Sequence, residues 1–188
     1  APAKKQQPKA DPNKVYNIDI GNSVVLGNPK AKVTVTKWTD FQWPYCAKSV
    51  SLVDELLEKY PNDVKVVIKN FPLSFHKQAK KAAKYALAAH KQGKYKEMYH
   101  KIMENYGKLK TNEDLPLDYA REFGLDMNQF IKDSESDEIA KQIDLEIEQL
   151  RTSGIPRLAV PKFLIQGKEP QGRSVAAFSA VIDAELKK

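Results

Sequence analysis

The sequence contains a single cysteine, Cys46, among its 188 residues. One thiol cannot form a disulfide within the chain, and it cannot supply a zinc site built from several cysteines. The sequence also has no apolar run long enough to cross a bilayer as a helix. We therefore expect no metal site, no bound cofactor and no membrane span.

The charge is unevenly distributed: the chain carries a formal net charge of +7, and residues 77–110 are strongly basic. Binding to a phosphate backbone requires clustered lysine or arginine. Here the lysines are spread around several predicted helices, arginine is scarce, and no recognition motif accompanies them. We interpret the basic region as a solvated helical surface and expect no nucleic-acid partner. Binding of acidic partners or of membrane surfaces is the alternative for this basic region, and no sequence feature specifies either one.

The residues from 33 to 60 predict a strand that leads into a helix. Val33 to Thr36 form a β-branched run, and the apolar residues after the following turn have helical spacing. Pro44 lies near the first helical turn, where its missing N–H costs nothing. The apolar positions of this helix are Cys46, Val50, Val53, Leu57 and Tyr60.

Further runs predict the remaining elements of an α/β protein. Val64 to Ile68 is a short apolar run that can pair in parallel with the first strand, giving a right-handed βαβ unit. Val15 to Ile20 alternates polar and apolar residues, which is typical of an edge strand. Residues 77–153 have helical periodicity throughout. A strand around Phe163 to Ile165, a hairpin completed around 170–173 and a final helix after Ser174 follow.

Three segments carry a resemblance to a known family. They read GNSVVLGNPKAKVTVTKWTDFQWPYCAKS, FPLSFHKQAKKAAKYALAAHKQGKYKEMYHKIM and VPKFLIQGK. This pattern resembles the DsbA-like thiol-disulfide oxidoreductases. The resemblance implies a thioredoxin-like α/β fold, with a central mixed sheet flanked by helices and an inserted all-helical subdomain. It implies a basic tail at 1–14, the two parts of the thioredoxin-like domain at 15–75 and 153–188, and the insertion at 76–152.

The chain departs from the family at the reactive position. Family members have a Cys-Pro-x-Cys motif at the end of the first long strand, and here the motif reads Trp43-Pro44-Tyr45-Cys46. Disulfide exchange needs one thiolate to attack and a second thiol to resolve the mixed disulfide. Trp43 can do neither. Cys46 corresponds to the resolving thiol, and it is either a small buried hydrophobe or a residual redox group.

Two further residues are candidate supporting groups. Lys37 occupies a place where many relatives have a glutamate beneath the cysteines. A lysine there favours a thiolate by charge, but it cannot accept a proton while it is charged. The alternative is that Lys37 extends to the surface from the strand end. His76 could act as an acid or base, although a role in fixing its loop is the interpretation that we favour.

The second half of the site is expected near Pro161. Val160-Pro161 followed by a strand resembles the family's cis-proline loop, which faces the active-site helix and presents backbone groups to an extended substrate. Pro156 is the weaker candidate because no strand directly follows it. Together with Pro44 and Tyr45, this loop predicts a peptide-binding groove.

Three functions remain open. The first is a binding module for extended or unfolded polypeptide segments, without dithiol activity, with Trp43 as an apolar anchor. The second is a disulfide oxidoreductase lineage that the loss of the attacking cysteine has disabled in this variant. The third is a single-thiol, glutathione-linked enzyme that uses Cys46. The resemblance also suggests a redox partner protein and a mature periplasmic or otherwise exported chain, with a cytoplasmic protein as the alternative.

Overall fold

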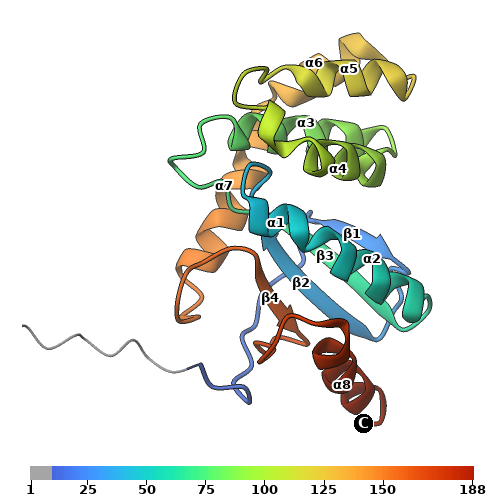
Figure 1. Ribbon diagram of the computed structural model, residues 1–188, viewed down its shortest axis with the longest axis vertical. Coiled ribbons are helices and arrows are strands. Elements are labelled where there is room, and N and C mark those ends of the chain that lie inside the picture. The colour runs from blue at the N-terminus through green and yellow to red at the C-terminus, as the bar shows by residue number, and fades with distance from the viewer. Residues whose placement is uncertain (1–9) are drawn as a thin grey trace, which may run out of the picture.

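The computed structural model describes residues 10–188, and residues 1–9 of the predicted tail lie outside that range (Figure 1). Its centre is a four-stranded mixed sheet with the order β1-β3-β2-β4. The central pair, β2 and β3, is parallel, and an antiparallel strand borders it on each side. The strands are β1 Val24–Gly27, β2 Val33–Thr39, β3 Val64–Asn70 and β4 Lys162–Ile165.

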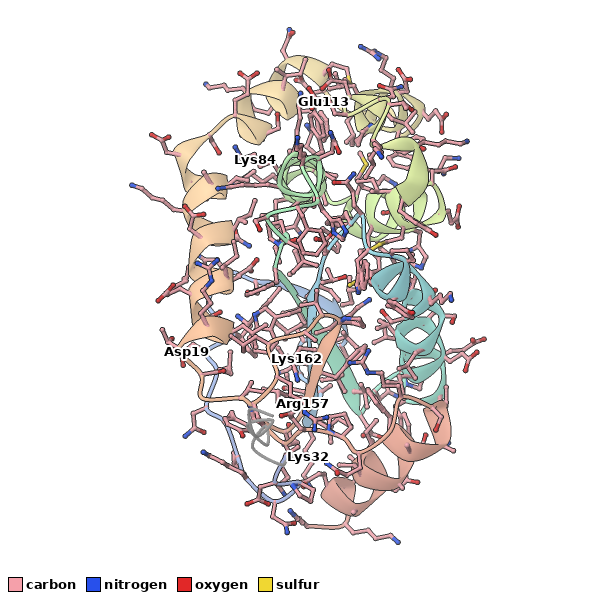
Figure 2. All side chains as sticks on the ribbon, turned by 60° about the vertical axis from the view of Figure 1, so that its left-hand side comes forward. Asp19, Lys32, Lys84, Glu113, Arg157 and Lys162 are labelled. Carbon is pink, nitrogen blue, oxygen red and sulfur yellow. The ribbon has the colours of Figure 1, made fainter. Side chains whose placement is uncertain are left out.

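Helices cover both faces of this sheet. α2 contacts β3 and α8, and α8 contacts β2 and β4, whereas α7 packs against β3 from the opposite face (Figure 2). α4, α5 and α6 form a bundle with α3 at one end of the sheet, and α1 lies between this bundle and α2 (Figure 1). The helices are α1 Pro44–Lys48, α2 Val50–Lys59, α3 Ala79–Lys91, α4 Tyr95–Glu104, the 3₁₀ turn η1 Tyr106–Lys108, α5 Leu115–Glu122, α6 Met127–Ser134, α7 Asp137–Arg151 and α8 Val175–Leu186.

This architecture confirms the predicted fold class. The predicted βαβ unit is formed by β2, α1 with α2, and β3, in which Val33 pairs with Val64 and Val35 with Val66. The helices α3 to α7 fall within the segment expected to be helical. None of the helices in residues 10–188 has both the length and the apolar character needed to cross a bilayer.

The alternation of side chains along β2 positions the functional residues. Successive side chains of a strand point to opposite faces of the sheet. Lys37 therefore points toward α4, where it contacts Tyr99, while its neighbour Trp38 points toward α7 and donates to the carbonyl of Glu146 at 2.9 Å. The candidate site residues lie on the face of the sheet that Lys37 shares with α1. The opposite face is covered by α7, with which Trp38 forms its hydrogen bond.

A buried polar network fixes α7 to the sheet. The carboxylate of Glu146, only 1% exposed, accepts hydrogen bonds from the backbone and side-chain nitrogens of Asn70 at 3.0 and 2.9 Å and from the hydroxyl of Ser23 at 2.6 Å. Lys69 donates to the same hydroxyl and to the carbonyl of Asp19, which lies beside α7 (Figure 2). Because buried polar groups need partners, the network defines how the insertion meets the sheet. Lys84 and Glu113 mark the far end of that insertion, opposite Lys32 (Figure 2).

The predicted edge strand at Val15 to Ile20 is wrong. That segment has no regular secondary structure and forms no ladder, and Val24–Gly27 pairs with β3 instead. The segment lies near the opposite edge of the sheet, where the backbone N–H of Tyr16 donates to the carbonyl of Gly167, just after β4, at 2.8 Å. A Cβ at Gly167 would approach the Tyr16 carbonyl to 2.7 Å, and the φ of this residue is +80°, so glycine suits the contact. An alternation of polar and apolar residues is compatible with a strand, but it does not show with which strand the segment pairs.

Two other local predictions are also wrong. The hairpin after β4 ends at an isolated bridge between Ile165 and Lys168, and the chain then continues as a loop. Pro170 has no N–H with which to continue a ladder. The helix predicted to run through Cys46 to Tyr60 is divided at Ser49, whose hydroxyl donates to the Cys46 carbonyl at 2.7 Å.

Candidate functional site

Trp43 occupies the N-cap of α1. Its backbone is extended, with φ −88° and ψ 121°, and Pro44 follows in the first turn. The Trp43 carbonyl accepts hydrogen bonds from the N–H groups of Cys46 at 3.0 Å and Ala47 at 3.1 Å. Positions 43 and 46 are therefore one helical turn apart, as the motif comparison requires.

The Trp43 indole belongs to a continuous row of rings. Its centroid lies 5.1 Å from that of Tyr45 and 5.4 Å from that of His76, and the His76 ring lies 4.6 Å from Phe75. We call Tyr45, Trp43, His76 and Phe75 the aromatic row. Its two ends are exposed, Tyr45 by 57% and Phe75 by 68%. Exposed aromatic rings in contact with one another are typical of binding surfaces.

The only thiol lies beneath this row. Cys46 is 0% exposed, and its Sγ accepts a hydrogen bond from the N–H of Asp40 at 3.3 Å. Burial raises the pKa of the Cys46 thiol, and this effect exceeds the opposing effects of the Asp40 N–H and of the Lys37 charge. A protonated, shielded thiol is a poor nucleophile and packs as a small apolar group.

The Lys37 side chain is buried, so the alternative that it extends to the surface is wrong. Its Nζ donates to the Tyr99 hydroxyl at 2.5 Å, and the residue is 0% exposed. Burial lowers the pKa of Lys37 to about 7, against the opposing influence of Cys46 and Asp54. Near neutral pH a large fraction of this lysine is therefore an uncharged amine, which can accept a proton.

His76 is held by a carboxylate that the sequence reasoning missed. Its Nδ1 lies 2.9 Å from Oδ2 of Asp40, whose side chain is fully buried. The Asp40 carboxylate also accepts from the N–H groups of Leu73 and Gln42, both at 2.7 Å. Asp40 thus ties the β3–α3 loop to the start of α1. In the sequence, only its position directly after the predicted strand and before the Trp43 motif indicated that Asp40 could belong to the site.

A groove runs beside α1 and α2. It has a volume of about 320 Å³, and both Tyr45 and Pro161 line it. The Val160–Pro161 peptide bond is cis, both residues are buried, and the Pro161 carbonyl accepts a hydrogen bond from Arg173 at 2.8 Å. The residues that define the groove are Tyr45, Leu52, Pro161, Phe163, Arg173 and Val175.

The structure thus brings most of the candidate residues together. Trp43, Pro44, Tyr45 and Cys46 share one turn, and Lys37 lies on the same side of the sheet. Trp43 itself does not line the groove; it reaches the groove through its contact with Tyr45. Within residues 10–188, no group of three or more His, Cys, Asp or Glu side chains is placed to hold a metal ion.

Comparison with known proteins identifies the family. Residues 19–184 match the protein-family model described as Thioredoxin. The chain belongs to the thioredoxin family. A thioredoxin-like oxidoreductase from Silicibacter pomeroyi DSS-3 is 29% identical, with a TM-score of 0.71 over 89% of this chain and 94% of that one. The α-DsbA1 of Wolbachia pipientis has the same fold, with a TM-score of 0.75 at 20% identity, covering 90% of this chain and 94% of that one.

A curated relative of this thioredoxin-family chain has a different name. The Na(+)/H(+) antiporter NhaA 1 of Salinispora arenicola is 30% identical over 167 residues, which cover 88% of this chain and 25% of the antiporter. The chain therefore spans about a quarter of the length of that relative. The match covers only part of the longer protein, whereas the name describes the whole of it.

Within the thioredoxin family, the chain shares its fold with the DsbA-type structure from Wolbachia pipientis. The predicted resemblance to DsbA-like proteins is confirmed by the helical insertion between β3 and β4 and by the structural matches. Trp43 and Cys46 are the first and last residues of the Trp43-Pro44-Tyr45-Cys46 segment at the start of α1.

Proposed function

We propose that this thioredoxin-family chain binds extended polypeptide segments and has no dithiol exchange activity. The observation that carries the proposal is the pairing of Trp43, in place of the attacking cysteine, with a lone thiol that is 0% exposed. Exchange requires an accessible thiolate and a second thiol, and neither is available here. By the resemblance to DsbA-like proteins, the chain acts outside the cytoplasm, with a redox partner protein as a further interactor.

The groove supports the binding half of the proposal. Leu52, Phe163 and Val175 give it an apolar floor, while Lys48 and Arg173 give it a polar rim. An apolar floor with a few polar groups at the edge is typical of sites that bury a side chain of a ligand. The exposed ring of Tyr45 stands at its entrance and continues into Trp43. Rigid aromatic rings of this kind are frequent anchors in protein interfaces.

A binding measurement tests this half. A fluorescein-labelled unfolded peptide is titrated with the protein, and anisotropy is recorded. Tyr45→Ser is expected to weaken binding about tenfold, because an anchoring ring contributes more than 1 kcal/mol and 1.4 kcal/mol is a factor of ten. Leu145→Ser is the matched control, since Leu145 is similarly exposed, by 56%, but lies on α7. Equal affinities of the two variants, or no binding by the native chain, would overturn the proposal.

The single-thiol alternative is tested by the reactivity of Cys46. In the native protein we expect no modification by a thiol reagent over a period in which the denatured protein reacts completely. The physical reason is that the reagent must reach Sγ, and burial both shields the thiol and raises its pKa. The measurement is the thiol absorbance assay with and without denaturant. Rapid labelling of the folded protein would favour the single-thiol enzyme over the binding module.

A further inference from the structure

A second pocket adjoins the aromatic row on the side of His76, away from the groove. It has a volume of about 490 Å³. Phe75 and His76 form one part of it, and Tyr106 comes from η1 in the insertion. The aromatic row thus connects two hollows, the groove at the Tyr45 end and this pocket at the Phe75 end. We call the second hollow the insertion pocket.

The lining of the insertion pocket is cationic. Lys77 and Lys110 are both exposed at its edge, and none of the described residues that line it is acidic. In the described part of the chain, neither ammonium has a carboxylate within ion-pair distance, whereas the neighbours Lys80 and Lys81 pair with Asp144 at 3.2 Å and Asp114 at 2.7 Å. The two lysines at the pocket are therefore available to a ligand from outside.

The groove, at the Tyr45 end of the aromatic row, is also lined mainly by positive charge. Lys48 lies over the Tyr45 ring at 5.4 Å from its centroid, and Arg173 binds the Pro161 carbonyl, with Glu55 as the one acidic residue among the described residues that line the groove. Among the described residues, the linings of the two hollows together contain four cationic side chains and one carboxylate. A surface of aromatic rings bordered by positive charge is complementary to a chain that alternates apolar and acidic residues.

The His76 ring adds a directed polar group. The buried Asp40 carboxylate, which accepts from two backbone N–H groups, can only accept from Nδ1 of His76, so the proton of the neutral ring is assigned to Nδ1. Nε2 then has no hydrogen-bond partner within residues 10–188, and the His76 ring contacts the rings of Trp43 and Phe75. A fixed ring with one unsatisfied nitrogen can accept a hydrogen bond from the backbone of an extended peptide.

We propose that the polypeptide ligand of this chain is an extended segment with an aromatic or large apolar residue and acidic neighbours. The apolar residue contacts the aromatic row, and an acidic side chain enters the insertion pocket between Lys77 and Lys110. This inference rests on the proposed binding function and specifies the class of ligand. The charges that support it line both hollows, and the site proposed for the acidic side chain lies in the insertion pocket, outside the groove.

The test uses three labelled peptides that differ only in the residues flanking a central phenylalanine: glutamate, glutamine or lysine. At moderate salt, the glutamate peptide is expected to bind the native chain about three- to tenfold more tightly than the glutamine peptide, the effect of one or two exposed ion pairs. The double variant Lys77→Gln/Lys110→Gln is expected to abolish this preference. Phe75→Ser is expected to weaken binding of all three peptides.

The matched control separates a site from general attraction. Lys132→Gln/Lys141→Gln lowers the net charge equally at exposed lysines of α6 and α7 and is expected to keep the preference. If the glutamate and glutamine peptides bind the native chain equally, the ligand class is wrong and the binding function stands. If both double variants lose the preference alike, the effect is the overall charge and the inference fails. If none of the three peptides binds, the proposed function fails with it.

Discussion

Replacement of Lys37 by methionine is expected to stabilise the folded protein near neutral pH and to lose this advantage in alkali. The Lys37 side chain is fully buried, with Tyr99 as its hydrogen-bond partner, and its pKa is lowered from 10.5 to about 7. Between these values the unfolded chain binds the proton more tightly, so the free energy of unfolding rises with pH. Below about pH 7 Lys37 is protonated in both the folded and the unfolded state, and its buried charge then destabilises the folded protein by the full amount.

The expected size makes this a strong test. A pKa difference of this size means that Lys37 lowers the free energy of unfolding by roughly 4 kcal/mol at pH 7 and by about 1 kcal/mol at pH 10. Methionine removes this penalty, but it leaves the buried Tyr99 hydroxyl without its partner, which costs about 1–3 kcal/mol at both values. The difference in unfolding free energy between variant and native protein should therefore fall by roughly 3 kcal/mol from pH 7 to pH 10.

Denaturant unfolding of the two proteins at each pH measures this difference. Lys69, whose pKa is also lowered by burial, is present in both proteins, so its titration cancels. The control is Lys132→Met, an exposed position on α6, where a change of less than about 0.5 kcal/mol is expected at either pH. An equal gap between Lys37→Met and native protein at pH 7 and pH 10 would mean that Lys37 keeps its charge in the folded state.

The second large effect is expected from Trp43→Cys. This change places a thiol one turn before Cys46, on the exposed side of the motif, and supplies the attacking group that the native chain lacks. Once an added oxidant such as glutathione disulfide has formed a disulfide between position 43 and Cys46, the variant is expected to oxidise a reduced dithiol peptide by exchange, and the native chain is expected to show no such activity.

The control for this gain is Trp43→Ser, which removes the indole without adding a thiol. Rates are measured with a peptide whose fluorescence changes when its two cysteines are oxidised, and folding of each variant is checked by circular dichroism. A folded Trp43→Cys protein that oxidises no faster than Trp43→Ser would exclude the reading of the chain as a disabled oxidoreductase. Activity in the variant would place the native chain in a redox lineage that lost its first cysteine.

Much of the fold was predictable because its signals are local. The β-branched run at Val33 to Thr36, the apolar spacing after Pro44 and the helical periodicity of the insertion each follow from short-range patterns. The errors concern pairing. Val15 to Ile20 alternates like a strand, but the edge beside β3 is taken by Val24–Gly27, a choice that depends on contacts between residues distant in the sequence.

The site was predictable in part for a similar reason. The motif located Trp43, Tyr45 and Cys46, since they are consecutive in one turn. Asp40 was missed because its importance comes from Leu73 and His76, more than thirty residues away. Likewise, no local pattern indicated that Phe75 would extend the ring contacts of Trp43 toward the insertion.

By itself the sequence determined the covalent limits of this protein: one thiol, a tryptophan at the first motif position, and the strand and helix that present them. The tertiary structure alone decided that this thiol is buried, that Lys37 lies in the core beside it, and that two hollows flank the aromatic row. The physical reason is that composition and spacing are properties of the chain. Burial, and with it the pKa and the accessibility of a group, depends on which distant segments pack over it.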